Sequence, residues 1–202
     1  EGEVITFGAI SFREGHDLIG VELLLTSPKG ESQRIRLSEG RPGLDEWTAQ
    51  LLLDQIGTWV YQISAWDDEY HTWLHNTEVK LQAGVDEELM MLEGERLLKR
   101  LAEEAKGKDK KALTDFAKQL ATSGSKPIER LTAALDSGLT EVADRNPLRT
   151  LETLTEPRRV LCERRLAGSG AWYEFFPRSE GATKNKDGVI VSGNFKTAVK
   201  SL

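Results

Sequence analysis

The chain has 202 residues, of which 39% are hydrophobic and 30% charged, and its five Trp and six Phe can fill the core of one large domain or two small ones. The formal net charge of −6 argues against a nucleic-acid partner or an anionic membrane surface, since both favour a basic patch. No run approaches the roughly 18 apolar residues of a membrane span, and the single cysteine, Cys162, excludes an internal disulfide and predicts a cytoplasmic location.

Residues 1–85 predict short antiparallel strands. Runs of β-forming residues alternate with turn signals such as Pro28-Lys29-Gly30. The runs are Val4–Ile10, Ile19–Thr26, Arg34–Leu37, Trp47–Leu53, Thr58–Trp66 and Trp73–Leu81. In Thr58–Trp66 the strand period of two places four side chains on one face, namely Trp59, Tyr61, Ile63 and Ala65. About seven such strands are typical of an antiparallel β-sandwich.

The segment 86–168 predicts a small helical bundle. Its first helix follows Asp86-Glu87-Glu88, whose negative charge suits a helix N-terminus. It carries one stripe, mostly apolar, made of Leu89, Leu92, Arg96, Leu97 and Leu101. Further helices are expected over Lys108–Ala121, from Pro127 through Leu135, over Leu139–Asp144, and from Thr155 through Leu166. Because β-like sequence resumes at Trp172, the bundle is predicted to be an insertion.

Residues 169–202 predict an incomplete βα unit. The strongly β-forming run Trp172–Phe176 ends at Pro177, a polar loop is expected over Glu180–Asp187, and Asn194–Leu202 has helical spacing. The chain therefore divides, as an expectation, into a β-sandwich domain (1–85), a helical insertion (86–168) and the start of a further domain (169–202).

Histidine and cysteine offer only weak site candidates. His71 and His75 are four residues apart, but the local pattern predicts a strand or turn, in which no third metal ligand is evident. A surface or structural role is the interpretation. Cys162 lies among arginines that could lower its pKa. Burial inside the bundle is the alternative that the sequence favours.

The carboxylates and aromatic residues have ordinary explanations too. Asp67 and Asp68 would point to opposite faces of a strand, so they are poor acid and base partners, and Glu103 and Glu104 read as solvated charge. One group of rings could either stack on sugars or fill the sandwich core: Trp59, Tyr61, Trp66, Tyr70 and Trp73. Gly168-Ser169-Gly170 lacks the spacing of a phosphate loop. No residue is assigned as catalytic, cofactor-binding or metal-binding.

Several segments carry a family resemblance. The run Gly170–Ser179, which contains Tyr173, Phe176-Pro177 and Arg178-Ser179, resembles the first barrel strand of glycoside hydrolase family 13. More specifically, the chain is similar to the maltosyltransferases that extend α-1,4-glucans from maltose 1-phosphate. The other matching pieces are Phe12–Asp17, Trp59–Trp66, Asp68, Thr72-Trp73, His75 and Ser192–Ala198.

The resemblance implies a fold and a function. The expected fold is mainly β plus α: an immunoglobulin-like antiparallel β-sandwich with an inserted helical bundle, followed by the first strand of a truncated (β/α)8 barrel. The parent enzyme would transfer maltose to the non-reducing end of an α-1,4-glucan with retention, without a cofactor. The catalytic carboxylates would lie on later barrel strands, so this chain is expected to be inactive, with no membrane or nucleic-acid partner.

Two roles remain open for the chain itself. The first is a structural module that forms a homodimer through the sandwich and the helical insertion, which predicts an exposed apolar patch. The second is a stand-alone α-glucan-binding β-sandwich, in which the aromatic strand face would hold the sugar. Binding of maltooligosaccharides distinguishes them.

Overall fold

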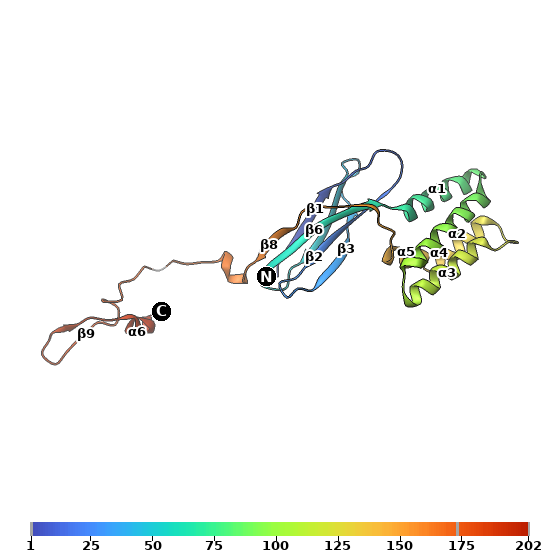
Figure 1. The fold of residues 1–202 in the computed structure, drawn as a ribbon. Coiled ribbons are helices and arrows are strands. Elements are labelled where there is room, and N and C mark those ends of the chain that lie inside the picture. The colour runs from blue at the N-terminus through green and yellow to red at the C-terminus, as the bar shows by residue number, and fades with distance from the viewer. Residues whose placement is uncertain (1, 173, 202) are drawn as a thin grey trace. The chain divides into compact units, whose positions relative to one another are not determined.

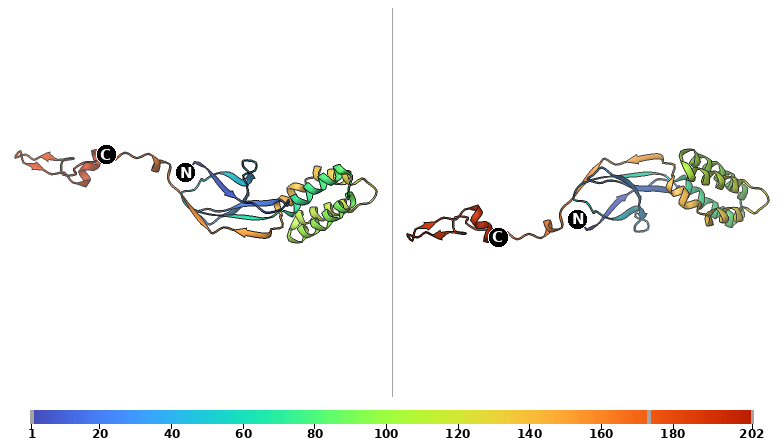
Figure 2. Two further views of the ribbon diagram at one scale, coloured as in Figure 1. Left: turned by 90° about the horizontal axis from the view of Figure 1, so that it is seen from above. Right: turned by 90° about the horizontal axis from the view of Figure 1, so that it is seen from below.

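A computed structural model describes residues 2–172 and 174–201, which form two compact units, Glu1–Glu163 and Arg164–Leu202. The first unit combines antiparallel sheets with helices, as the sequence predicts for a mixed β and α chain. Within this unit the helices gather beyond one end of the strands and cover neither sheet (Figure 1; Figure 2).

The strands of the first unit form two antiparallel sheets. A three-stranded sheet has the order β1-β5-β4, with β1 at Val4–Ile10, β4 at Ser38–Glu39 and β5 at Glu46–Leu52. A five-stranded sheet has the order β3-β2-β6-β7, and β8 also pairs with β6. Its strands are β2 (Ile19–Thr26), β3 (Ser32–Arg36), β6 (Gly57–Asp67), β7 (Thr150–Leu154) and β8 (Arg158–Cys162).

Both sheets contribute to one hydrophobic core. Phe7 comes from β1, Leu23 from β2, and Trp59 and Ile63 from β6, and all four are buried. The inward face of β6 follows the predicted period of two, because Tyr61 and its alternating neighbours all pack into this cluster. The shared core is what holds the two sheets face to face.

The helices form a second core of their own. They are α1 (Glu69–Ala83), α2 (Glu87–Glu104), α3 (Gly107–Ala121), α4 (Pro127–Asp136) and α5 (Leu139–Arg145). The apolar stripe predicted for the first helix is buried in part, since Leu97 and Leu101 lie in this core and Leu89 and Leu92 are exposed. The helices expected between Asp86 and Asp144 are therefore confirmed, to within a residue or two at their ends.

The strand predicted over Trp73–Leu81 is wrong, because this segment belongs to α1. Asp68 caps the helix by accepting a hydrogen bond from the His71 N–H, and Gly84 closes it with a positive φ of 68°. Tyr70, Trp73 and Thr77 are buried at spacings of three and four. The helical period is thus present, but it is carried by aromatic and β-branched residues that also favour strands.

The helix predicted from Thr155 through Leu166 is also wrong. β7 ends just before this region at Leu154, β8 runs through its middle, and both strands add to β6. The Thr155 N–H donates to the Ile63 carbonyl and its hydroxyl accepts from the Ile63 N–H. β6 would otherwise present an unpaired edge, and this long-range pairing outweighs the local helical spacing.

The second unit is small. β9 (Thr183–Lys184) pairs with β10 (Ile190–Val191), and α6 (Phe195–Ala198) leads into the 3-10 turn Val199–Ser201. The predicted strand Trp172–Phe176 is not formed by Trp172 or residues 174–176, and Tyr173 lies outside the described residues. None of the helices in residues 2–172 and 174–201 combines the length and the hydrophobicity that crossing a bilayer requires.

Candidate functional site

A buried polar network lies where β6 passes into α1, and Asp68 is its centre. Asp68 is 4% exposed, and its backbone N–H donates to the Leu18 carbonyl at 2.9 Å. Its carboxylate accepts hydrogen bonds from Arg36 of β3 and from Nδ1 of His71, the latter at 2.9 Å. The second ring nitrogen of His71 lies 3.5 Å from the carboxylate of Asp144 on α5. One carboxylate therefore ties the five-stranded sheet to the helices.

The charges of this network shift its pKa values. Burial opposes ionisation of Asp68, but the hydrogen bonds from His71 and Arg36 together outweigh it and lower the pKa of Asp68 to about 2. The hydrogen bond to Asp68 raises the pKa of His71 above its ordinary value, against the opposing effect of burial. Both ring nitrogens of His71 face carboxylates, an arrangement that favours the imidazolium.

The loop between β1 and β2 closes over this network. Arg13 contacts Asp67 at 2.6 Å and Asp17 at 3.2 Å, and the Leu18 N–H donates to the Thr72 hydroxyl at 2.8 Å. The structure thus brings together the segment 12–17 and the Asp68 region, two of the segments that carry the family resemblance. The two segments are far apart in the sequence, so no local pattern predicts this contact.

A second set of charges surrounds Trp66, and sequence reasoning missed it. Glu22 is buried and accepts hydrogen bonds from Arg34 at 3.2 Å and Arg149 at 2.8 Å. Arg36 and Arg149 lie over the Trp66 ring, 4.9 and 5.1 Å from its centroid. Glu22 and Arg149 are 127 residues apart, and no local pattern joins them. The set fixes the segment after α5 onto the sheet.

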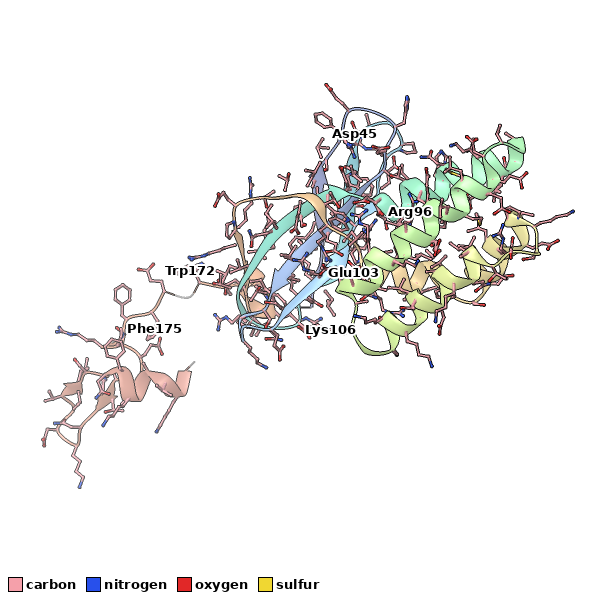
Figure 3. All side chains as sticks on the ribbon, turned by 45° about the vertical axis from the view of Figure 1, so that its right-hand side comes forward. Asp45, Arg96, Glu103, Lys106, Trp172 and Phe175 are labelled. Atoms are coloured by element: carbon pink, nitrogen blue, oxygen red, sulfur yellow. The ribbon has the colours of Figure 1, made fainter. Side chains whose placement is uncertain are left out.

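Two grooves flank this region and share Arg13 and Asp17. One, of about 410 Å³, is lined by the loop, α1 and α2, and the other, of about 390 Å³, by the loop, β3 and β5. Figure 3 labels one lining residue of each, Arg96 in the first and Asp45 near the second. Both volumes fall in the range of small-ligand pockets.

The predicted aromatic group does not form a sugar-stacking platform. Four of its rings are buried, two in the sheets and two in the helices: Trp59, Trp66, Tyr70 and Trp73. Tyr61 is half-buried and packs edge-on against Phe7, with centroids 5.1 Å apart. These rings therefore fill cores, as the alternative interpretation predicts, but Tyr70 and Trp73 lie in the helical core and not in the sandwich core.

The remaining candidates lie apart. Cys162 is buried on β8 in the sheet core, and not in the helical bundle as expected. His71 and His75 are one turn apart on α1, where His75 is exposed. Across residues 2–172 and 174–201, no three His, Cys, Asp or Glu side chains form a group that could hold a metal ion.

The paired carboxylates also separate. Asp67 is engaged by Arg13, whereas Asp68 is engaged by Arg36 and His71. Glu103 and Glu104 are exposed at the end of α2. The Gly168-Ser169-Gly170 segment begins at the last residue of a 3-10 turn and is exposed. None of these arrangements matches a catalytic pair of carboxylates.

Comparison with known proteins relates the chain to one enzyme family. The family model described as "Alpha-1,4-glucan:maltose-1-phosphate maltosyltransferase, domain N/S" matches residues 1–164. The whole chain aligns with curated maltosyltransferases of that name from Streptomyces coelicolor (enzyme 1), at 38% identity, Corynebacterium glutamicum, at 34%, and Mycobacterium tuberculosis, at 33%. It spans 29%, 31% and 32% of their respective lengths.

Proposed function

This chain belongs to the family of α-1,4-glucan:maltose-1-phosphate maltosyltransferase N/S domains, and we propose from that membership that it is the non-catalytic N-terminal region of such an enzyme. The family match over residues 1–164 carries the proposal. The whole enzyme would be of the α-amylase type and would transfer maltose from maltose 1-phosphate to the non-reducing end of an α-1,4-glucan, with retention. The chain by itself would be inactive, and a cytoplasmic location stays a prediction.

The domain architecture is part of the proposal. We infer an immunoglobulin-like sandwich (1–85), a helical insertion (86–168) and the start of a (β/α)8 barrel (169–202). Because β7 and β8 pair with β6, these two strands belong to the sandwich. α1 belongs to the helices, because its buried Tyr70 and Trp73 lie in the helical core. In the last segment Trp172 is 101% exposed and Phe176 is 69% exposed. The exposure of these large apolar side chains supports the proposal that this segment packs against further barrel strands.

An apolar stripe on the helices supports the proposed homodimer. Val85, Leu89 and Leu92 are 51%, 46% and 40% exposed. Leu89 and Leu92 are three residues apart on one side of α2, and Val85 lies just before the helix begins. A contact between two copies of one chain is usually made by the same patch on each. This stripe is apolar and unpartnered within the described residues, so it suits such a self-complementary contact.

A charge placed in the stripe tests the assembly role. We expect the chain to sediment as a dimer and Leu89→Glu to raise the dimer dissociation constant at least about tenfold, since burying an unpaired carboxylate costs more than 1.4 kcal/mol. Sedimentation velocity over a concentration series measures both. Thr132→Glu adds the same charge at an exposed position of α4 and should leave the dimer intact. A chain that stays monomeric up to its solubility limit would rule out dimerisation through this region.

A further inference from the structure

The groove between the β1–β2 loop, α1 and α2 has a floor and walls of different chemistry. Trp73, Met90 and Leu97 line it and are almost fully buried. The Trp73 indole N–H donates to the Met90 carbonyl at 2.9 Å, which fixes the ring and leaves its polar atom satisfied. The floor is therefore apolar and preorganised, as small-molecule sites generally are.

The walls carry balanced charge. The lining holds four cationic side chains and four carboxylates. Several neutralise one another, because Arg13 contacts Asp17 and Asp67 and Arg100 contacts Glu69 at 2.5 Å. An ionic ligand of either sign would meet as many like charges as opposite ones, so its net electrostatic gain would be small.

Three polar side chains of the groove remain uncommitted. The side chains of Asn76 on α1 and of Glu93 and Arg96 on α2 make no hydrogen bond or ion pair within residues 2–172 and 174–201. Together they offer an amide, a carboxylate and a guanidinium. A sugar hydroxyl can donate to the carboxylate and accept from the other two at once. An ion of one sign cannot use all three.

We propose that this groove binds a short neutral oligosaccharide, with Glu93, Arg96 and Asn76 contacting its hydroxyls above the floor at Trp73. The choice of an α-1,4-linked glucan as the oligosaccharide rests on the proposed function. The site differs from the strand-face platform considered from the sequence, whose rings are buried. It would hold glucan in addition to any active site of the whole enzyme.

The test is a titration of the full 202-residue chain with maltotriose, followed by nitrogen-edited NMR. The Trp73 indole and Asn76 side-chain amide signals should shift and saturate. Glu93→Gln and Arg96→Gln should each weaken binding roughly five- to tenfold, the loss of one charge-assisted hydrogen bond. Glu103→Gln removes the same charge from an exposed position farther along α2, labelled with Arg96 in Figure 3, and should leave binding unchanged.

Two results would overturn the site. One is an absence of saturable shifts at Trp73 and Asn76, including the case in which only the exposed Trp172 indole responds. The other is equal weakening by Glu93→Gln and Glu103→Gln. Tighter binding of glucose 1-phosphate than of maltotriose would contradict the proposal that the ligand is a neutral sugar. Binding is measured apart from dimerisation. A monomeric chain that binds maltotriose would support the binding site and contradict the assembly role. A dimeric chain that does not bind maltotriose would support the assembly role and contradict the binding site.

Discussion

At the scale of single residues, one histidine carries a pH dependence. His71 contacts Asp68 and Asp144 through its two ring nitrogens, and Arg36 and Tyr70 are its other charged or titratable neighbours. Its pKa is raised in the folded chain, so its contribution to stability is full below its ordinary value of 6.5 and is lost as the pH rises through the folded value. The contribution of Asp68 to stability depends on pH in the opposite direction, because the pKa of Asp68 is lowered. This contribution is present above the ordinary pKa of 3.8 and is lost as the pH falls toward about 2.

We therefore expect the wild-type chain to be more stable at pH 5.5 than at pH 8. In His71→Phe that difference should largely disappear, and urea unfolding at the two pH values measures it. His75→Phe changes an exposed histidine one turn away and should keep the wild-type difference. If His71→Phe retains the full pH dependence, another group is responsible. NMR titration of the His71 ring in Asp144→Asn should also give a lower pKa.

At the scale of elements, the contact between α1 and α2 depends on a glycine. A Cβ on Gly94 would lie 2.2 Å from Cζ2 of Trp73 and 2.9 Å from Cδ1 of Leu120. Alanine would raise helix propensity by about 1 kcal/mol. The clash in a packed core costs about 1–3 kcal/mol and opposes that gain. The absence of a side chain at Gly94 is what lets the indole lie against α2.

Gly94→Ala should thus lower the free energy of unfolding, by up to about 2 kcal/mol after the propensity gain. In a Trp73→Phe background the smaller ring lacks the clashing atoms, so the same substitution should cost less. A double-mutant cycle in urea measures this coupling. Equal costs in both backgrounds would show that the close approach to Trp73 is not the cause.

At the scale of the whole molecule, the two units differ in the size of their hydrophobic cores. Residues 1–163 contain two hydrophobic clusters, one in the sheets and one in the helices. In the unit 164–202, Ala198 is the one buried hydrophobic residue among those described, and large apolar side chains such as Trp172 and Phe195 are exposed. The stability of the chain should therefore reside in the first unit.

Limited trypsin digestion tests this distribution. Arg164 and Arg165 are exposed at the boundary of the two units, so cleavage there should be rapid and leave a resistant fragment ending near that point. The melting temperature of the fragment should stay within about 2 °C of that of the intact chain, which corresponds to about 1 kcal/mol or less. A fragment that unfolds on cleavage would show that residues 165–202 stabilise the sheets or helices. Mass spectrometry identifies the cut.

The sequence by itself determined the local elements whose periodicity was unambiguous. Val4–Ile10 and Ile19–Thr26 are strands with the predicted ends, and the face of β6 that holds Trp59 and Ile63 is the buried one. The helix after Pro127 also begins as expected. In these segments hydrophobic spacing and turn or capping residues indicate the same structure, so no distant contact is needed to choose between alternatives.

The tertiary structure decided the segments whose local signal was ambiguous and every contact of the candidate site. β7 and β8 are strands because β6 supplies their partner, and α1 is a helix because its aromatic face packs into the helical core. The Asp68 network joins the neighbours Asp68 and His71 to Arg36 and to Asp144, both of which are distant in the sequence. Such contacts depend on how the chain returns on itself, and local periodicity carries no information about that path.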